Sequence, residues 1–312
     1  MRRKFLLVFS LFRACKYPDG TSGMKQARIK AEPKRKPLSF VLGTALFLLL
    51  VLAGFGAQRR GEAAELNFGF SPSSKSWFQV EGGDVHAKDN INSPVPAGLS
   101  FMVNPQGVVS AGGSTDFNGQ NPQWLVQDPS INLAKFNYDY FYRLLGSPPN
   151  SNFYGNSNDI SAGVVVYYSS GQISTLGNWK NFSRQAVILV NGNLKIDKEI
   201  TLGPNGFLAF VVNGNIVIDE NVGVGKNSTD TSLEGVYFAQ GVFSTGTSAV
   251  GGHEKLIAKG IFAAQGGFNL GRDLGDDNET TPAETFIFDP RLLVKMPKEL
   301  TKSTMSWTEV AP

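Results

Sequence analysis

The 312-residue chain is 41% hydrophobic, contains 35 glycines and has a formal net charge of +3, which excludes a largely disordered chain and favours an ordered, turn-rich protein. Residues 1–60 carry 13 Lys and Arg and two acidic residues, whereas residues 61–312 carry 16 basic and 24 acidic residues, a net charge of −8. Because nucleic-acid affinity depends mainly on Lys and Arg that neutralise phosphates, the acidic body argues against a nucleic-acid partner.

An uncharged run of 20 residues, Leu38 to Ala57, follows a basic leader, residues 1–36. As a helix this run measures about 30 Å, enough to span a bilayer. Lys and Arg crowd the sequence before the run, and only Arg59 and Arg60 follow it closely, so the positive-inside rule predicts a cytoplasmic N-terminus and export of residues 61–312. We predict a transmembrane helix or signal anchor over residues 37–57.

The length of the run and the Arg pair after it favour a retained anchor, and hence a single-pass cell-membrane protein with an extracytoplasmic body. Cleavage near Gly54 and Gly56 is the alternative and would give a secreted protein. Residues 1–23 are a candidate misassigned start, because a start at Met24 places a basic stretch directly before the apolar run. Cys15, the only cysteine, would then be lost; residues 61–312 contain no cysteine and so no disulfide.

Residues 58–76 are small and polar and are predicted to form a flexible tether. Residues 77–160 are predicted to form an irregular β region, with order beginning at Trp77 and a candidate first coil directly after it. Within this region, residues 135–146 (KFNYDYFYRLLG) predict the one soluble helix, which Gly146 and the following prolines end. Its aromatic residues are interpreted as a cover for an end or flank of a sheet, and a sugar-stacking platform is the alternative.

A 22-residue repeat organises the rest of the chain: AVILVNGNLKID (186–197) recurs as LAFVVNGNIVID (208–219). A period of this size is typical of stacked units that cannot bury their apolar faces alone, and continuous apolar strands suit a parallel sheet. The predicted fold is mainly β: a parallel β-helix or β-solenoid of at least five coils over residues 161–285, with one N-terminal transmembrane helix and one short soluble capping helix.

The corners of the predicted coils are marked by glycines that follow one another at steps of 21, 22, 27 and 25 residues. Gly adopts positive φ without steric cost and Asn tolerates it, and stacked Asn side chains can form a hydrogen-bonded ladder. We therefore interpret these residues as structural: Gly171, Asn191, Gly192, Asn193, Asn213, Gly214, Asn215, Gly241 and Gly266.

The tail, residues 286–312, continues the strand pattern to Phe288 and then becomes polar and extended up to Trp307. Because an open solenoid end exposes unpaired strand edges, we predict that this tail is a C-terminal cap. A recognition tail for a sorting or assembly system is the alternative.

No motif for a catalytic residue or a cofactor is recognised: HExxH, the nucleophile elbow and the P-loop are missing, and His86 and His253 are interpreted as exposed turn residues. The carboxylates Asp197 and Asp219 occupy equivalent repeat positions about 4.8 Å apart, a spacing close to that of a retaining glycosidase pair but explained by the repeat. An acidic loop offers weak Ca²⁺ candidates, with a solvated loop as the favoured interpretation. These candidates are Asp273, Asp276, Asp277 and Glu279.

The Val-Asn-Gly-Asn coils, the Gln-Gly turns at 240–241 and 265–266 and the tail FIFDPRLLVKMP resemble envelope-anchored β-solenoid proteins of bacteria, including candidate-phyla and pilus-accessory-like proteins. The resemblance covers residues 160–312 and implies a parallel β-helix on the cell surface, with no catalytic residues to transfer. We expect a structural or adhesive surface protein that contacts the membrane, through residues 38–57, and cell-wall polysaccharide or other surface proteins. The alternatives are a polysaccharide-active β-helix enzyme and an accessory subunit of a pilus-like filament.

Overall fold

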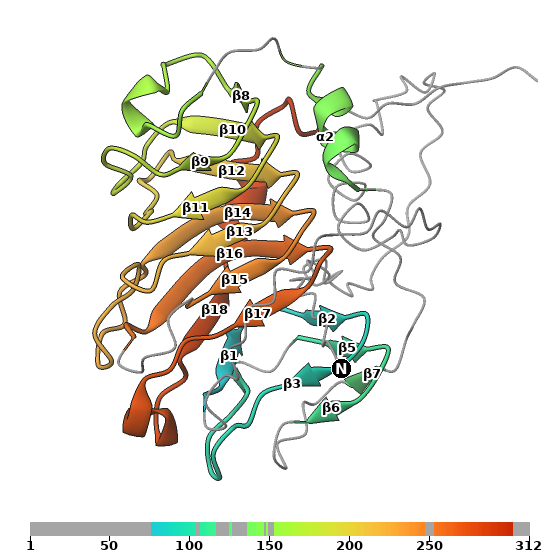
Figure 1. Ribbon diagram of the computed structural model, residues 1–312, viewed down its shortest axis with the longest axis vertical. Coiled ribbons are helices and arrows are strands. Elements are labelled where there is room, and N and C mark those ends of the chain that lie inside the picture. The colour runs from blue at the N-terminus through green and yellow to red at the C-terminus, as the bar shows by residue number, and fades with distance from the viewer. Residues whose placement is uncertain are drawn as a thin grey trace, which may run out of the picture.

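The computed structural model describes residues 76–103, 107–116, 125–126, 136–146, 148, 153–246 and 253–301. These residues form a parallel β-solenoid of about seven turns with few helices, which confirms the β-solenoid part of the predicted fold class (Figure 1). No helix within the described residues has the length and apolar character needed to cross a membrane. The predicted leader, residues 1–36, and the predicted span, residues 37–57, lie outside the described residues.

Eight parallel strands form the larger sheet of the stack. In spatial order they are β4 (Met102–Val103), β1 (Phe78–Glu81), β18 (Glu284–Phe288), β16 (Leu256–Ala264), β14 (Leu233–Ala239), β12 (Phe207–Val212), β10 (Gln185–Val190) and β8 (Val166–Ser169).

Three smaller parallel sheets complete the coils. The five-stranded sheet contains β17 (Phe268–Leu270), β15 (Phe243–Thr245), β13 (Ile216–Ile218), β11 (Leu194–Ile196) and β9 (Ile173–Ser174). The N-terminal coils contribute β2 (Val85–Ala87), β5 (Val109–Ala111) and β7 (Leu125–Val126), and, beside them, β3 (Ile91–Asn92) and β6 (Thr115–Asp116).

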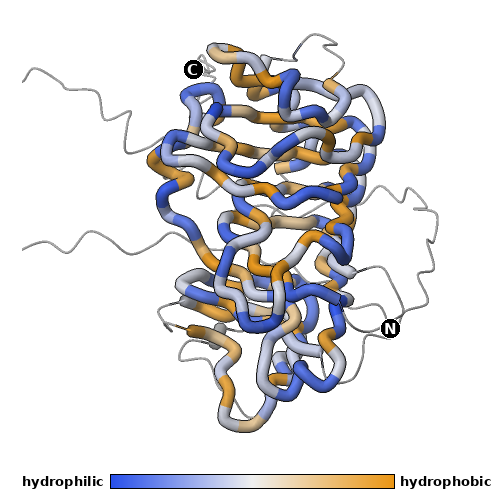
Figure 2. Tube along the Cα trace, turned by 90° about the vertical axis from the view of Figure 1, so that its left-hand side faces the viewer, coloured by the Kyte–Doolittle hydropathy of each residue, from blue (hydrophilic) through white to orange (hydrophobic). Residues whose placement is uncertain are grey.

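The strand register follows the sequence repeat. Val190 of β10 pairs with Val212 of β12, and Leu194 of β11 pairs with Ile216 of β13, each a step of 22 residues. Because every strand pair is parallel and in register, equivalent side chains stack directly above one another along the solenoid. Figure 2 shows these coils from the side as a pile of flattened loops.

The order of the coils in space differs from their order in the chain. Strand β1 pairs with β18 on one side and with β4 on the other, so the N-terminal coils extend the solenoid beyond its last C-terminal strand. Residues 77–103 and 107–116, which the sequence predicts as irregular β structure, therefore form coils of the same stack. Residues 286–288, predicted as the start of a C-terminal cap, are instead part of β18, an internal strand paired with β16 and β1.

The opposite end of the solenoid begins with residues 153–164, which include the short helix η1 (Ser157–Asp159). The Phe153 amide donates to the Tyr168 carbonyl at 2.9 Å, and the Leu176 amide donates to the Gly155 carbonyl at 2.8 Å. This segment thus follows the edge of β8 and β9, and it closes part of the coil that contains these two strands.

The strands of the larger sheet are buried on both faces. In β10, Ala186, Ile188 and Val190 face the interior of the solenoid, whereas Val187 and Leu189 face outward, and all five are 0% exposed. The outward side chains are covered by helix α2 (Tyr138–Leu144) and by the segment after β18, which contains helix α3 (Arg291–Val294). Burial on two faces accounts for the continuous apolar runs in the sequence.

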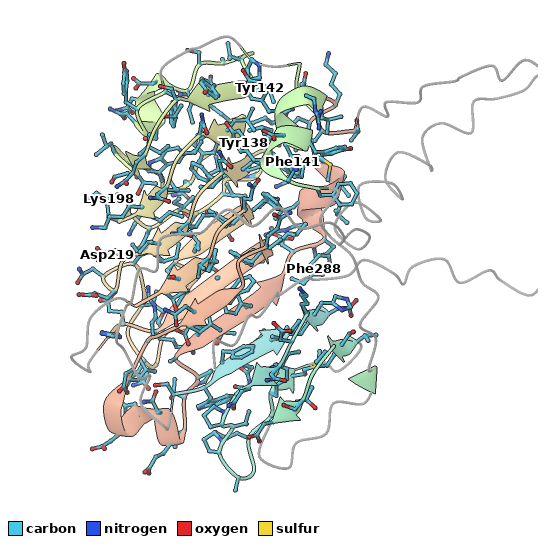
Figure 3. The ribbon with its side chains drawn as sticks, turned by 45° about the vertical axis from the view of Figure 1, so that its right-hand side comes forward. Tyr138, Phe141, Tyr142, Lys198, Asp219 and Phe288 are labelled. Atoms are coloured by element: carbon cyan, nitrogen blue, oxygen red, sulfur yellow. The ribbon has the colours of Figure 1, made fainter. Side chains whose placement is uncertain are left out.

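Helix α2 corresponds to the helix predicted over residues 135–146, and it covers a flank of the sheet rather than an end (Figure 3). Asn137 caps it by accepting a hydrogen bond from the Tyr140 amide at 2.9 Å. Phe141 points into the outer-face cluster and lies 5.3 Å from Phe238 of β14, measured between ring centroids. The buried aromatic residues of helix α2 therefore pack against the larger sheet.

The interior is organised by a stack of aromatic rings from successive coils. Phe210, Tyr237 and Phe262 are register partners in β12, β14 and β16, and their ring centroids lie 5.8 and 5.3 Å apart. The Tyr237 hydroxyl, which is buried with its ring, donates to the Glu234 carbonyl at 2.9 Å. Each of these three coils thus contributes one large ring to the core.

We predict that Gly214→Ala lowers the melting temperature of the full-length chain, because its added Cβ would lie 2.3 Å from Asn193 Oδ1 and 2.7 Å from the Gly192 carbonyl oxygen. Overpacking of this kind costs about 1–3 kcal/mol. Gly225→Ala is the matched control, since its Cβ meets nothing within 4 Å. Equal melting temperatures for the two variants would contradict the packing described for this corner.

Candidate functional site

The repeated corner is the most regular polar feature of the described structure. The Gly214 amide donates to the Gly192 carbonyl, the Gly241 amide to the Gly214 carbonyl and the Gly266 amide to the Gly241 carbonyl, at 2.8–2.9 Å. Gly171 lies next to Gly192 in the same column, where an added Cβ on Gly192 would meet the Gly171 backbone at 2.6 Å. The corners approach so closely that only glycine fits.

Two amide columns flank these glycines. Asn213 Nδ2 donates to Asn191 Oδ1 at 2.8 Å, and Asn193 Oδ1 accepts from the Asn215 amide at 2.9 Å. Asn215 Oδ1 in turn accepts from the Val242 amide at 2.8 Å, and because the Val242 side chain has no hydrogen-bonding group, this column of side-chain bonds ends there. The predicted Asn residues therefore stack and bond from coil to coil.

The N-terminal coils repeat the same corner with a different acceptor. Asp84 follows Gly83, as Asn193 follows Gly192, and Asp84 Oδ1 accepts from the Val108 amide of the next coil at 2.7 Å. Val85 and Val109 pair 24 residues apart. The sequence reasoning missed this repeat, although the two Gly-x-Val strings, 83–85 and 107–109, are a visible signal.

The two later corners hold helix α2 in place. Gln240 and Gln265 occupy the position that Asn191 and Asn213 hold in earlier coils. Gln240 Oε1 accepts from the Tyr138 amide at 2.9 Å, and Gln265 Nε2 donates to the Phe136 carbonyl at 3.3 Å. The longer amide side chain thus fixes the start of the helix that covers the sheet.

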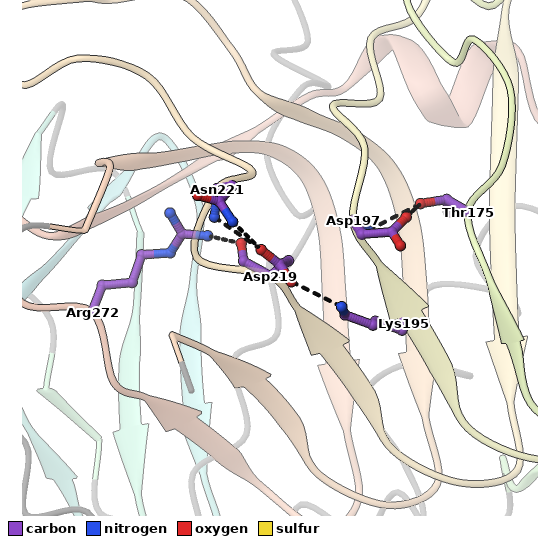
Figure 4. A network of polar contacts seen from close by, with 6 residues as sticks. All are labelled: Thr175, Lys195, Asp197, Asp219, Asn221 and Arg272. Carbon is purple, nitrogen blue, oxygen red and sulfur yellow. Dashed lines mark hydrogen bonds and ion pairs between the residues drawn. The ribbon is translucent and has the colours of Figure 1, made fainter. Parts of the chain in front are cut away.

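The carboxylates Asp197 and Asp219 lie at equivalent positions of neighbouring coils, but each has its own partners (Figure 4). Asp197 Oδ1 accepts from the Thr175 hydroxyl at 2.9 Å. Asp219 Oδ2 pairs with Lys195 Nζ at 2.9 Å, and Asp219 Oδ1 accepts from Asn221 Nδ2 at 2.8 Å. Both carboxylates therefore bond to side chains of the solenoid itself.

Partial burial alone would raise the pKa of Asp219, but the hydrogen bonds from Lys195 and Asn221 outweigh it and lower that pKa below its usual value. The bond to Asp219 raises the pKa of Lys195. A retaining glycosidase needs one protonated carboxyl as general acid beside an ionised one. The partners of Asp219 hold it in the ionised form, which suits a structural ion pair.

The four Ca²⁺ candidates do not converge on one point. Asp273 Oδ1 turns toward its own loop and accepts from the Gly275 amide at 2.8 Å, whereas Asp277 pairs with Lys226 Nζ at 2.8 Å. Asp276 and Glu279 are exposed on helix η2 (Gly275–Glu279). Among the described residues, no group of three or more His, Cys, Asp and Glu could hold a metal ion.

The two histidines have different environments. His86 lies in β2 and is 7% exposed, so its prediction as an exposed turn residue is wrong. His253 lies outside the named strands, and its Nδ1 accepts from the Asp273 amide at 3.1 Å.

The sequence analysis did not identify Arg272, a buried arginine beside the acidic loop. Arg272 is 0% exposed and follows β17, and its guanidinium reaches across the solenoid to four backbone carbonyls. The distances are 2.6 Å to Glu254, 2.8 Å to Asp219 and Val222, and 3.4 Å to Glu220. It thereby ties the loop after β13 to the loop before β16.

Glu284 lies beside Arg272 at the junction between the two sets of coils. Its strand position pairs with Leu256 of β16 and with Phe78 of β1. Glu284 Oε1 accepts from the Thr245 hydroxyl at 2.7 Å and from the Arg272 amide at 3.1 Å. Burial raises the pKa of Glu284 to about 7, despite these bonds and the nearby guanidinium charge.

We predict that this carboxyl makes folding pH-dependent. Since Glu284 has a pKa of about 7 in the folded state, above the ordinary value of 4.5, the folded state holds the proton more tightly. Stability should fall as pH rises from about 4.5 to 7, by about 3 kcal/mol in total. Denaturation midpoints at pH 5 and pH 8 should differ less for Glu284→Gln, which keeps the acceptor, than for the full-length natural chain.

The matched control is Glu199→Gln, at a surface carboxylate that pairs with Lys180. This variant should retain the natural difference between pH 5 and pH 8. An unchanged difference in Glu284→Gln would show that Glu284 is not the group that titrates.

Comparison with protein-family models, with curated proteins and with solved structures gives no match for this chain. The described contacts themselves are therefore the basis for a function. They show a solenoid in which the repeated polar side chains bond to neighbouring coils.

Proposed function

We propose that the chain is a membrane-tethered structural protein whose solenoid stands outside the cytoplasm as a rigid scaffold and adhesive surface. The uncharged run 38–57 and the basic residues before it support the tether and its orientation. A fold alone does not fix a function, so the role of the solenoid must be argued from its side chains.

The observation that carries the structural role is the use of repeated polar side chains. Asn193, Asn215 and Asp84 each accept a backbone amide from the next coil, and Asp197 and Asp219 bond to side chains of the previous coil. Here the repeat commits them to holding one coil on the next, which stiffens the stack.

The adhesive role is supported by the outer face of the five-stranded sheet. One row of register partners crosses all five strands with four polar or charged side chains and one valine, and it consists of Ser174, Lys195, Val217, Ser244 and Asn269. All five are at least partly exposed. Strands about 4.8 Å apart make this row a flat, evenly spaced surface. Such a surface suits an extended partner with a regular repeat, such as a cell-wall polysaccharide.

The proposal predicts that the two sides of the run 38–57 lie in different compartments. In a Cys15→Ser background, Asn269→Cys places one thiol on the exposed face of β17, and Ala27→Cys places one in the basic leader. A membrane-impermeant maleimide added to intact cells should label the residue 269 thiol, and should label the residue 27 thiol only after lysis.

Labelling of position 269 only after lysis would contradict the proposed location. Recovery of the residue 269 thiol from the culture medium, with position 27 absent from that product, would show a cleaved signal and so contradict the tether. The background protein without an introduced cysteine controls for non-specific labelling.

A further inference from the structure

The amide side chains at two corners use their oxygen atoms to bond the coils and leave their N–H groups over. Asn193 Oδ1 accepts from the Asn215 amide at 2.9 Å, and Asn215 Oδ1 accepts from the Val242 amide at 2.8 Å. Because a backbone amide only donates, the atom that faces it must be the side-chain oxygen, and Nδ2 lies on the other branch of the side chain. Within the described residues, no protein group accepts a hydrogen bond from either Nδ2.

The stacking of the coils does not need these N–H groups. In the N-terminal coils Asp84 holds the same place after its glycine, and its Oδ1 accepts from the Val108 amide at 2.7 Å. A carboxylate has no donor, so an acceptor oxygen alone is sufficient to bond one coil to the next at this corner. The Nδ2 groups of Asn193 and Asn215 are therefore available to a partner outside the chain.

These Nδ2 groups belong to the exposed face of the five-stranded sheet. Asn193 and Lys195 are exposed and flank the buried Leu194, so both side chains point outward. The register places Gln172 at the equivalent position of one neighbouring coil and Asn215 at that of the other. Gln172 is exposed and Asn215 is partly exposed. We call Gln172, Asn193 and Asn215 the donor column, in which an amide recurs on three successive coils about 4.8 Å apart.

The charges beside the donor column indicate an uncharged partner. Lys195, two residues after Asn193, pairs with Asp219 Oδ2 at 2.9 Å, so its charge is balanced within the solenoid. Residues 61–312 carry a net charge of −8, which disfavours a polyanion. Among uncharged groups, an amide carbonyl matches an N–H donor best, because it accepts through two lone pairs and, unlike a hydroxyl, has no donor of its own.

We propose that the donor column binds the acetamido carbonyls of a neutral, N-acetylated polysaccharide that lies along the solenoid. Such a polymer repeats an amide carbonyl from sugar to sugar, as the donor column repeats an amide N–H group from coil to coil. This inference rests on the proposed adhesive function and names the class of polymer for the same face.

Two sugar hexamers test the inference on the purified full-length chain in detergent. One is the hexamer of β-1,4-linked N-acetylglucosamine, and the other is the hexamer of β-1,4-linked glucose, which has the same linkage and no acetamido group. Calorimetry should give a dissociation constant at least about tenfold lower for the acetylated hexamer, because the amide donors then gain carbonyl partners.

Asn193→Asp separates the donor from the structural role of the same side chain. It removes the N–H donors and keeps the oxygen that accepts from the Asn215 amide, as Asp84 does in its own corner. The dissociation constant for the acetylated hexamer should rise at least about fivefold, whereas the melting temperature should stay close to that of the natural chain.

The matched control is Asn90→Asp, which makes the same chemical change on a different sheet. Asn90 Oδ1 accepts from the Ser114 amide at 2.7 Å, between the coils that contain β3 and β6. This variant should bind the acetylated hexamer as the natural chain does. An equal loss of binding in the two variants would overturn the inference, and so would an unchanged dissociation constant in Asn193→Asp.

The natural chain alone gives two further outcomes. Equal affinity for the two hexamers would overturn the inference and would leave the proposed adhesive face with another polymer. Binding of neither hexamer would also overturn it, whereas the proposed location is decided separately by labelling of the residue 269 thiol on intact cells.

Discussion

The close approach of glycine backbones at one corner of each coil sets the geometry of the whole molecule. Gly192, Gly214, Gly241 and Gly266 leave no room for a Cβ, and their amides and carbonyls bond directly from coil to coil. This contact fixes the register, and the register in turn stacks Asn on Asn and ring on ring. Core packing, the polar ladders and the flat outer face all follow from it.

A second constraint comes from the apolar outer face of the larger sheet. Parallel strands that are hydrophobic on both faces need a cover, which α2 and the segment after β18 provide. The Gln side chains at corners 240 and 265 fix the start of that cover. The residue before the corner glycine therefore bonds from coil to coil where it is Asn, in the earlier coils, and bonds to the start of α2 where it is Gln, in the later coils.

The sequence was sufficient for the fold class, the 22-residue register and the helix, because these depend on local periodicity and composition. It was insufficient where contacts are distant in the chain. Nothing local indicates that β1 pairs with β18, about 200 residues away, or that the Arg272 guanidinium donates to the Asp219 carbonyl, 53 residues earlier in the chain. Beyond the candidate first coil after Trp77, the N-terminal coils were also missed, because their strands are only two to four residues long.

The position of the N-terminal coils is the central structural claim and is open to a direct test. Glu81 of β1 and Ile287 of β18 are register partners, whereas a stack in simple chain order would place β1 beside β8. In a Cys15→Ser chain, Glu81→Cys with Ile287→Cys should oxidise to a disulfide, since paired strands bring Cα atoms within the required range. Failure of that pair, with a disulfide formed instead between Glu81→Cys and Val166→Cys on β8, would contradict the observed order of the coils.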